Sequence, residues 1–257
     1  MIKLGISAFY HDSAAALIID NQVIAAAEEE RFTGIKHDSS FPYNAIEYCL
    51  KEYGVTPKDV RQICWYEQPE VKEDRVVKTF DKHFFKTFFL KRKFKREKES
   101  KNPENILRNI GFKKTEIVYT PHHLSHAAFS FYTSPYNEAD ILVVDGVGEW
   151  DTVTFWKGDK DKISLKHSYK FPNSLGMFYS TMTSYLGFRP NEGEYKVMGL
   201  APYGNPAKYF EKLKGLIKEV GFRVDQKYFT WEYSEKIMFN KKLANLLDIP
   251  PRLPEEE

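Results

Sequence analysis

Residues 2–29 read IKLGISAFYHDSAAALIIDNQVIAAAEE, and this stretch decides the fold class. Its apolar runs predict three successive strands, at residues 2–7, 14–19 and 23–29. Asp20-Asn21 predicts a tight turn between the second strand and the third. The chain therefore opens with a unit of strand, loop, strand, turn and strand.

A similar order of elements recurs in the second half of the sequence. Strands are predicted at residues 141–144, 152–156 and 163–169, and a polar loop with two glycines, 145–150, follows the first of them. In both halves a loop of this kind lets backbone N–H groups approach a phosphate closely. The sequence thus predicts two similar halves that together bind a nucleotide.

Helical spacing of apolar residues connects these strands. Helices are predicted at 43–53, 122–132, 174–186 and 206–220, and short strands at 63–66 and 116–119. Residues 80–101 predict a long basic amphipathic helix that packs through its phenylalanines, with a membrane or RNA contact as the alternative. A charged stretch follows the third strand and is interpreted as an exposed loop; it consists of Glu28, Glu29, Glu30 and Arg31, and then Lys36 and His37.

Composition indicates a globular protein without a strong electrostatic field. Hydrophobic residues make up 42% of 257 residues and the formal net charge is only +2, so any attraction to nucleic acid or to membranes must be local. The sequence shows neither a signal-peptide core nor an apolar run of membrane-spanning length. With only two cysteines, both in apolar surroundings, we expect a cytoplasmic protein with no membrane partner.

The segment Thr120 to Ala127, TPHHLSHA, carries the strongest chemical signal. His122 and His126 are four residues apart and so fall on one face of a helix, a spacing that suits one metal ion. Imidazole is a good ligand for iron or zinc, and Asp145, at the end of a buried strand, is the candidate that completes the site. Structural histidines are the alternative. His123 is expected to pack or to bond locally.

The polar loops supply the other candidate residues. His11, Asp12 and Ser13 follow the first strand, where ligands usually bind in α/β proteins, and His11 is a candidate general base. Gly146 and Gly148 lie in the matching loop, and Lys196 can reach a phosphate or carboxylate. The alternative is that these loops are plain turns.

Four ordered segments resemble the carbamoyltransferases of the nodulation-protein-U and antibiotic-carbamoylation type. They span residues 2 to about 206 and read GISAFYHDSAAALIIDNQVIAAAEEERFTGIKHDSSFP, HHLSHAAFSFYTSPY, VVDGVGEWDT and GEYKVMGLAPYGNP. The resemblance implies an α/β, actin-like (ribonuclease-H-type) two-lobed domain. The first lobe is expected at 1–138 and the second at 139–257, ending before its closing elements.

The resemblance also implies an activity. Such a domain transfers a carbamoyl group from carbamoyl-adenylate to a hydroxyl of a small molecule, and a carboxyl-terminal domain, here expected to be missing or supplied by a partner chain, makes the adenylate from carbamoyl phosphate and ATP. His122, His126 and Asp145 match the family's ligands for a divalent metal, expected to be iron, or else zinc or manganese. His11 matches a histidine near the transferred group. A further metal-binding aspartate lies in the family's later sequence.

Two other functions remain open from the sequence. One is a tRNA-modifying enzyme that transfers threonylcarbamoyl to adenosine, for which the basic stretch 80–101 is the special support, although we do not expect nucleic acid as a partner. The other is a non-catalytic nucleotide-binding module in which the histidines are structural.

Overall fold

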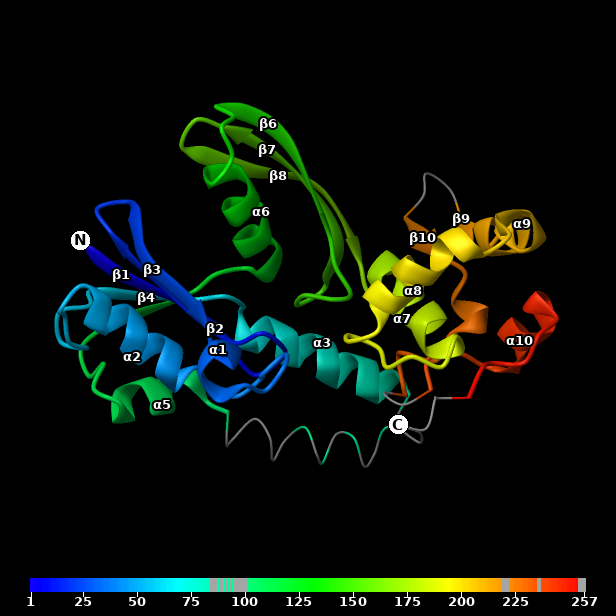
Figure 1. The fold of residues 1–257 in the computed structure, drawn as a ribbon, viewed down its shortest axis with the longest axis horizontal. Coiled ribbons are helices and arrows are strands. Elements are labelled where there is room, and N and C mark those ends of the chain that lie inside the picture. The colour runs from blue at the N-terminus through cyan, green and yellow to red at the C-terminus, as the bar shows by residue number, and fades with distance from the viewer. Residues whose placement is uncertain are drawn as a thin grey trace. The chain divides into compact units, whose positions relative to one another are not determined.

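The computed structural model describes residues 1–83, 87, 90, 92, 94, 101–218, 222–234 and 237–253. The chain divides into two compact units, which are considered separately (Figure 1). The first comprises Met1–Pro69 and Leu90–His122, and the second comprises Glu70–Phe89 and His123–Glu257.

The first unit is built on a five-stranded sheet in the order β3-β2-β1-β4-β5. The first three strands form an antiparallel meander, while β4 pairs parallel to β1 and β5 parallel to β4. All five strands were predicted, and the turn at Asp20 and Asn21 has the left-handed backbone that such hairpins require. The strands are β1 (Ile2–Ser7), β2 (Ala14–Ile19), β3 (Gln22–Glu28), β4 (Gln62–Trp65) and β5 (Glu116–Tyr119).

Alternation of side chains along these strands produces the core of the first unit. Leu4, Leu17 and Ile63 are completely buried and lie with the buried face of helix α2 (Tyr43–Glu52), which carries Ala45, Ile46, Cys49 and Leu50. Helix α5 (Pro103–Asn109) adds Leu107, and a short helix α1 (Glu30–Thr33) follows β3. The predicted helix at 43–53 is therefore confirmed.

Glu29 corrects the expectation of an exposed acidic loop, because its side chain is only 2% exposed. Its two carboxylate oxygens accept hydrogen bonds from the backbone N–H groups of Asn44 (3.1 Å) and Ala45 (2.8 Å) and from the Asn44 side chain (2.7 Å). Helix α2 begins after Pro42, whose side chain makes no capping bond. Glu29 therefore caps α2 from outside the helix, and its negative charge suits the positive end of the helix dipole.

The second unit contains an antiparallel meander, β6 (Glu138–Val144), β7 (Asp151–Asp159) and β8 (Lys162–Lys170). Helix α6 (His122–Tyr132) packs on it through Ala127 and Phe131, which join Ile141, Val143 and Trp156 in one cluster. A Cβ atom on Gly158 would lie 2.5 Å from the Phe131 ring, so only glycine lets helix and strand approach this closely here. The predicted strands and helix are confirmed.

A third core lies in the remainder of the second unit, with Tyr185, Leu216 and Leu243 nearly or fully buried. The predicted helix at 174–186 is present as α7, but the single helix predicted for 206–220 is wrong. The chain leaves helical structure at Tyr209 and again at Gly215, so it forms short elements there. The elements are α3 (Pro69–Lys82), α7 (Leu175–Tyr185), α8 (Glu194–Leu200), η1 (Ala201–Tyr203), η2 (Pro206–Lys208), α9 (Phe210–Lys214), β9 (Ile217–Lys218), β10 (Arg223–Val224), η3 (Gln226–Tyr228) and α10 (Lys241–Leu247).

These elements confirm the expected fold class. The strand order 3-2-1-4-5, antiparallel in the meander and parallel beyond it, is that of the actin-like, ribonuclease-H-type fold, and the second meander repeats its first three strands. The lobe boundary at residue 138 stays a prediction. The basic helix predicted for 80–101 lies mostly outside the described residues, with only its first part in α3. None of the helices that the described residues form has the length and apolar character needed to cross a bilayer.

Replacing Glu29 by alanine tests its capping role. Glu29→Ala removes the acceptor of the buried Ala45 N–H and of the partly buried Asn44 N–H, and we expect the free energy of unfolding to fall by about 2–4 kcal/mol in urea denaturation. The matched control is Glu28→Ala, which removes a half-exposed carboxylate that pairs with Arg31 at 3.6 Å and should change stability by less than about 0.5 kcal/mol. Equal effects of the two substitutions would contradict the assignment.

Candidate metal centre

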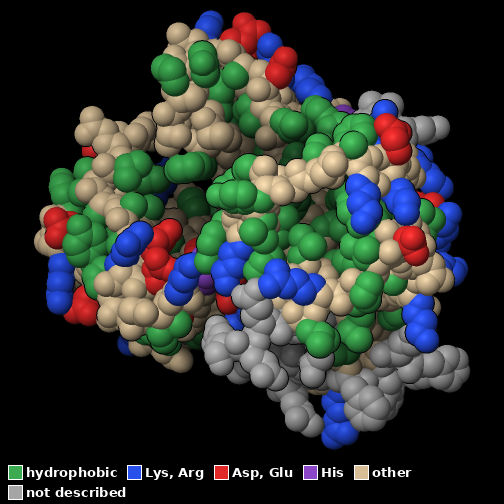
Figure 2. All heavy atoms as spheres, turned by 45° about the vertical axis from the view of Figure 1, so that its right-hand side comes forward, with side chains coloured by type: hydrophobic (Ala, Val, Ile, Leu, Met, Phe, Trp, Pro, Cys, Tyr) green, Lys and Arg blue, Asp and Glu red, His purple; other side chains and the backbone are tan. Residues whose placement is uncertain are grey.

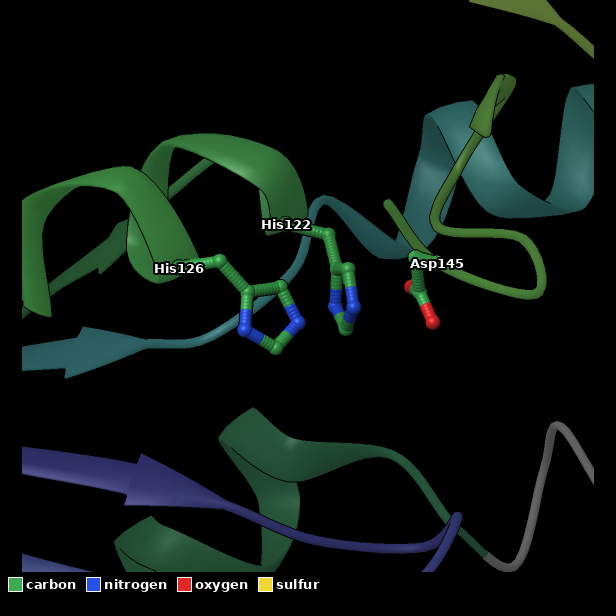
Figure 3. A group of neighbouring side chains, drawn as sticks. All are labelled: His122, His126 and Asp145. Atoms are coloured by element: carbon green, nitrogen blue, oxygen red, sulfur yellow. The ribbon is translucent and has the colours of Figure 1, made fainter. Parts of the chain in front are cut away.

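Two histidines and one aspartate converge in this structure (Figure 3). His122 and His126 lie one turn apart on α6, and their imidazoles project from the same side of the helix. Asp145 directly follows β6 and comes to the same place. One ligand atom of each residue lies within 4.8 Å of the others. The structure therefore brings together the three residues that the sequence suggested as metal ligands.

Helix α6 is held in place by the histidine between the two candidate ligands. His123 is 1% exposed, and its Nδ1 lies 2.9 Å from Oγ1 of Thr154 on β7. The indole of Trp156 donates to the same hydroxyl at 2.7 Å. The local bonding expected for His123 is confirmed, and it fixes the rotation of α6 so that His122 and His126 face away from the sheet.

Asp145 is positioned by its own loop and by helix α7. Its backbone N–H bonds to the Thr152 carbonyl at 2.9 Å, and its Oδ1 accepts a hydrogen bond from Gly146 N–H at 2.6 Å. Ser174, the N-cap of α7, donates its hydroxyl to the Gly146 carbonyl at 2.6 Å and accepts from Met177 N–H. One side chain therefore both caps α7 and holds the loop that carries Asp145.

Gly176 makes this contact possible. A Cβ atom there would lie 2.5 Å from the Asp145 carbonyl oxygen and 2.6 Å from Gly146 N, closer than such atoms approach in proteins. Ser174 and Gly176 were not predicted from the sequence to support the site. The visible signal was the serine N-cap followed by a glycine inside the first turn of a helix, where glycine is otherwise unfavourable.

The donor set fits a first-row divalent metal. Two imidazole nitrogens and a carboxylate oxygen suit iron, zinc or manganese, and three protein ligands leave positions open for other ligands. Ligands of one metal lie up to about 4 Å apart, so donors within 4.8 Å need only small side-chain rotations to close on an ion.

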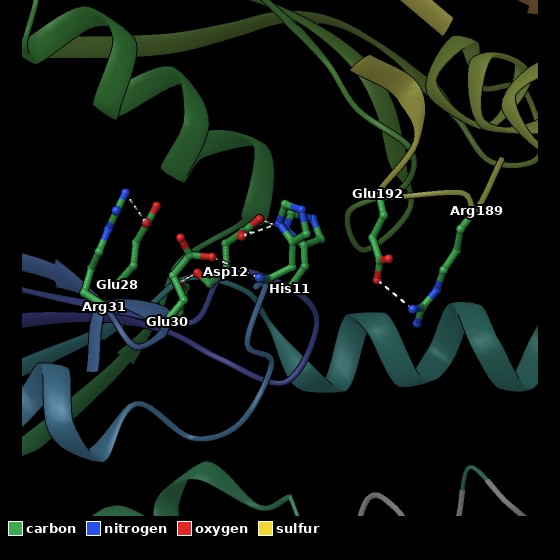
Figure 4. Close-up of polar contacts among 9 residues, drawn as sticks. His11, Asp12, Glu28, Glu30, Arg31, Arg189 and Glu192 are labelled. Carbon is green, nitrogen blue, oxygen red and sulfur yellow. Dashed lines mark hydrogen bonds and ion pairs between the residues drawn. The ribbon is translucent and has the colours of Figure 1, made fainter. Parts of the chain in front are cut away.

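The loop after β1 forms a separate polar cluster in the first unit (Figure 4). His11 Nδ1 lies 2.7 Å from Oδ2 of Asp12, and His37 Nδ1 lies 2.8 Å from its Oδ1. Burial acts to raise the pKa of Asp12, but the hydrogen bonds from His37 and His11 outweigh it and hold that pKa below its usual value. Glu30 also belongs to this cluster, since its carboxylate accepts from His37 N–H at 2.9 Å. His37 was seen in the sequence only as part of a charged stretch.

The remaining candidates for nucleotide binding lie in varied surroundings. Ser13 is fully buried, and its backbone bonds to Asp38 and Glu29. Gly146 and Gly148 lie in the loop after β6, where Gly148 N–H bonds to the Asp151 carbonyl at 3.0 Å. Lys196 is exposed on α8 with its Nζ 5.7 Å from the centre of the Phe188 ring. No described contact tests nucleotide binding by these residues, which stays a prediction.

Exposed apolar side chains surround Lys196 in the sequence. Tyr195, Met198 and Tyr203 are all more than half exposed. Figure 2 shows hydrophobic side chains interspersed with lysine and arginine on the face that it draws.

Comparisons with known proteins show which family the chain belongs to. A family model described as the carbamoyltransferase N-terminus matches residues 2–253. The chain belongs to this carbamoyltransferase family. It is 42% identical to the uncharacterized protein sll1178 of Synechocystis sp. over 98% of its length, and 33% identical to the nodulation protein NolNO of Sinorhizobium fredii over 84%. Among solved structures, YeaZ from Pseudomonas aeruginosa matches 67% of the chain and 70% of its own, with 11% identity and a TM-score of 0.35.

The matched region is only part of each curated relative. It covers 43% of the Synechocystis protein and 32% of NolNO. The chain thus spans less than half the length of these relatives, and it corresponds to the amino-terminal domain of the family.

Removing one imidazole tests the metal centre. In protein purified without chelator, we expect stoichiometric iron, zinc or manganese, and His126→Ala should weaken binding of added metal by at least about 100-fold, measured by elemental analysis and calorimetry. His167→Ala, which removes an exposed histidine on β8, is the control and should bind metal normally. Equal metal content in the two variants would exclude His126 as a ligand.

Gly176→Ala tests the support of Asp145 without touching a ligand. The added methyl group must displace the Asp145–Gly146 backbone, so we expect the affinity for metal to fall about 10-fold or more and the protein to lose about 1–3 kcal/mol of stability. In the matched control Gly199→Ala, also in a helix, the methyl group meets no atom within 4 Å. That variant should keep its metal and be as stable as the parent or slightly more so.

Proposed function

We propose that this chain is the metal- and nucleotide-binding part of an ATP-dependent O-carbamoyltransferase. It transfers a carbamoyl group from carbamoyl-adenylate to a hydroxyl of a small-molecule acceptor. The observation that carries the proposal is the convergence of His122, His126 and Asp145 in a domain of the carbamoyltransferase family.

His122, His126 and Asp145 would hold the metal, whose chemistry is that of a Lewis acid that stabilises negative charge on phosphate or carbamoyl oxygens. The protein's own contribution is to keep these donors pre-positioned. His123 fixes α6 from the sheet side, and Ser174 and Gly176 fix the loop of Asp145. Such outer contacts preserve the orientation of ligands when charge develops nearby.

His11 is proposed to accept the proton of the acceptor hydroxyl, which is too weakly acidic to ionise unaided. Its imidazole is about half exposed and so can meet a substrate from solution. Gly146, Gly148, Ser13 and Lys196 are the proposed contacts of the nucleotide. Because Gly146 and Gly148 have no side chains, a phosphate can approach the backbone of their loop closely.

Carbamoyl phosphate and ATP are proposed to react in a carboxyl-terminal domain, since the relatives are more than twice as long as the region that this chain matches. The reaction is proposed to take place in the cytoplasm. The tRNA-modifying alternative depended on the basic stretch 80–101, which lies mostly outside the described residues. In the non-catalytic alternative the histidines are structural and bind no metal. The measurements of metal content described above test this alternative.

Reconstitution tests the proposed reaction. We expect residues 1–257 alone to form no product from carbamoyl phosphate, ATP and hydroxylated acceptors such as sugars and aminoglycosides. Addition of the carboxyl-terminal part of the Synechocystis relative should restore transfer, seen by mass spectrometry. His126→Ala should then lower transfer about 100-fold or more while pyrophosphate release, which reports adenylate formation, continues.

Product formed at an undiminished rate by His126→Ala would refute the assigned site, with His167→Ala as the active control. Robust transfer by residues 1–257 alone would show that no second domain is needed. Failure of every acceptor in the panel, with pyrophosphate still released, would argue against a sugar-like acceptor.

A further inference from the structure

The two oxygens of the Asp12 carboxylate are shared between two histidines, one on each oxygen. The distances, 2.7 Å to His11 Nδ1 and 2.8 Å to His37 Nδ1, are those of charge-assisted hydrogen bonds. His11 is the neighbour of Asp12 in sequence, whereas His37 comes from the segment after α1, 25 residues further along the chain. Side chains distant in sequence are therefore joined by one anion.

The backbone around this carboxylate is built to hold it. Asp12 and His37 both have positive φ values, 47° and 56°, a conformation that aspartate and histidine tolerate better than most residues. Ser13 N–H bonds to the Asp38 carbonyl at 2.8 Å, and Phe9 N–H bonds to the Ser39 carbonyl at 3.0 Å. These two bonds tie the loop after β1 to the segment of His37 on both sides of Asp12.

The carboxylate decides the protonation pattern of both rings. An ionised carboxylate only accepts hydrogen bonds, so a neutral imidazole facing it through Nδ1 must carry its proton there. Nε2 of each ring then keeps its lone pair, and the tautomer of a histidine is set in this way by the bond that its other nitrogen makes. Because both Asp12 oxygens face imidazoles, Asp12 itself is poorly suited to contact a phosphate, which carries the same sign of charge.

We propose that Asp12 is a positioning residue that holds His11 and His37 in the Nδ1–H tautomer, and that His37 is a second histidine able to receive the acceptor's proton. This role rests on the proposed function. In the transfer step the hydroxyl oxygen bonds to the carbamoyl carbon and its proton passes to an Nε2 atom. The bond between that carbon and the phosphate oxygen breaks, and its electron pair leaves with AMP.

The tautomers can be measured on this chain without any activity. Long-range proton–nitrogen correlation spectra of histidine-labelled protein at pH 8 should show Nδ1–H for both residues, assigned from His11→Gln and His37→Gln. In Asp12→Asn the amide offers one acceptor and one donor, so one of the two histidines should change to Nε2–H. Nε2–H in either histidine of the parent, or no change in Asp12→Asn, would overturn the proposal.

Two variants complete the design. Glu28→Gln alters a carboxylate that pairs with Arg31, and His11 and His37 should both keep the Nδ1–H tautomer. His37→Gln removes one partner, and His11 should stay Nδ1–H because Asp12 Oδ2 is still present; this variant preserves a test if Asp12→Asn unfolds.

Reconstituted transfer supplies the second readout. Asp12→Asn should lower kcat at least 10-fold, with metal content and the acceptor KM unchanged. Changed tautomers with an unchanged kcat would disprove the catalytic part of the proposal. Should the parent transfer no carbamoyl group at all, the proposed function fails, while the spectra still decide whether Asp12 sets the tautomers.

Discussion

A carboxylate buried away from cations must be satisfied by N–H donors, and Glu29 meets this constraint at the start of α2. Its backbone N–H bonds to the Ser13 carbonyl at 2.8 Å, so the same residue joins the end of β3, the loop after β1 and helix α2. The segment that carries His37 and Asp38 runs between these fixed points. The capping interaction of Glu29 therefore helps to place the polar cluster of His11, Asp12 and His37, together with the backbone bonds of Phe9 and Ser13.

In the second unit a loop that carries a candidate functional residue is also held by the start of a helix, although the contacts differ. A strand leads into a loop that carries a functional candidate, Asp145, and a helix N-terminus holds that loop, through Ser174 and Gly176. Glycine appears at Gly176 and Gly158 because in each case a helix approaches a strand or its loop more closely than a side chain permits. These approaches bring α6, β6 and α7 to the positions in which His122, His126 and Asp145 converge.

The candidate metal centre and the cluster around Asp12 differ in the charge at their middle. At the metal centre one carboxylate and two imidazoles present their donor atoms to a common point, as a cation requires. At the cluster around Asp12 the carboxylate itself is the centre, and two imidazoles donate to it. The same residue types are thus proposed to hold a cation in one place and to set the protonation of histidines in the other.

The sequence by itself determined strands β1 to β8, the hairpin turn and the helices at α2, α6 and α7, because apolar periodicity and turn residues are local properties. It also named His122, His126 and Asp145, since their spacing and position in the chain were visible. Only the tertiary structure decided that Glu29 is buried, that residues 206–218 form several short elements, and that His37 meets Asp12. These features depend on partners far apart in the chain, and composition carries no information about which N–H group a carboxylate will meet.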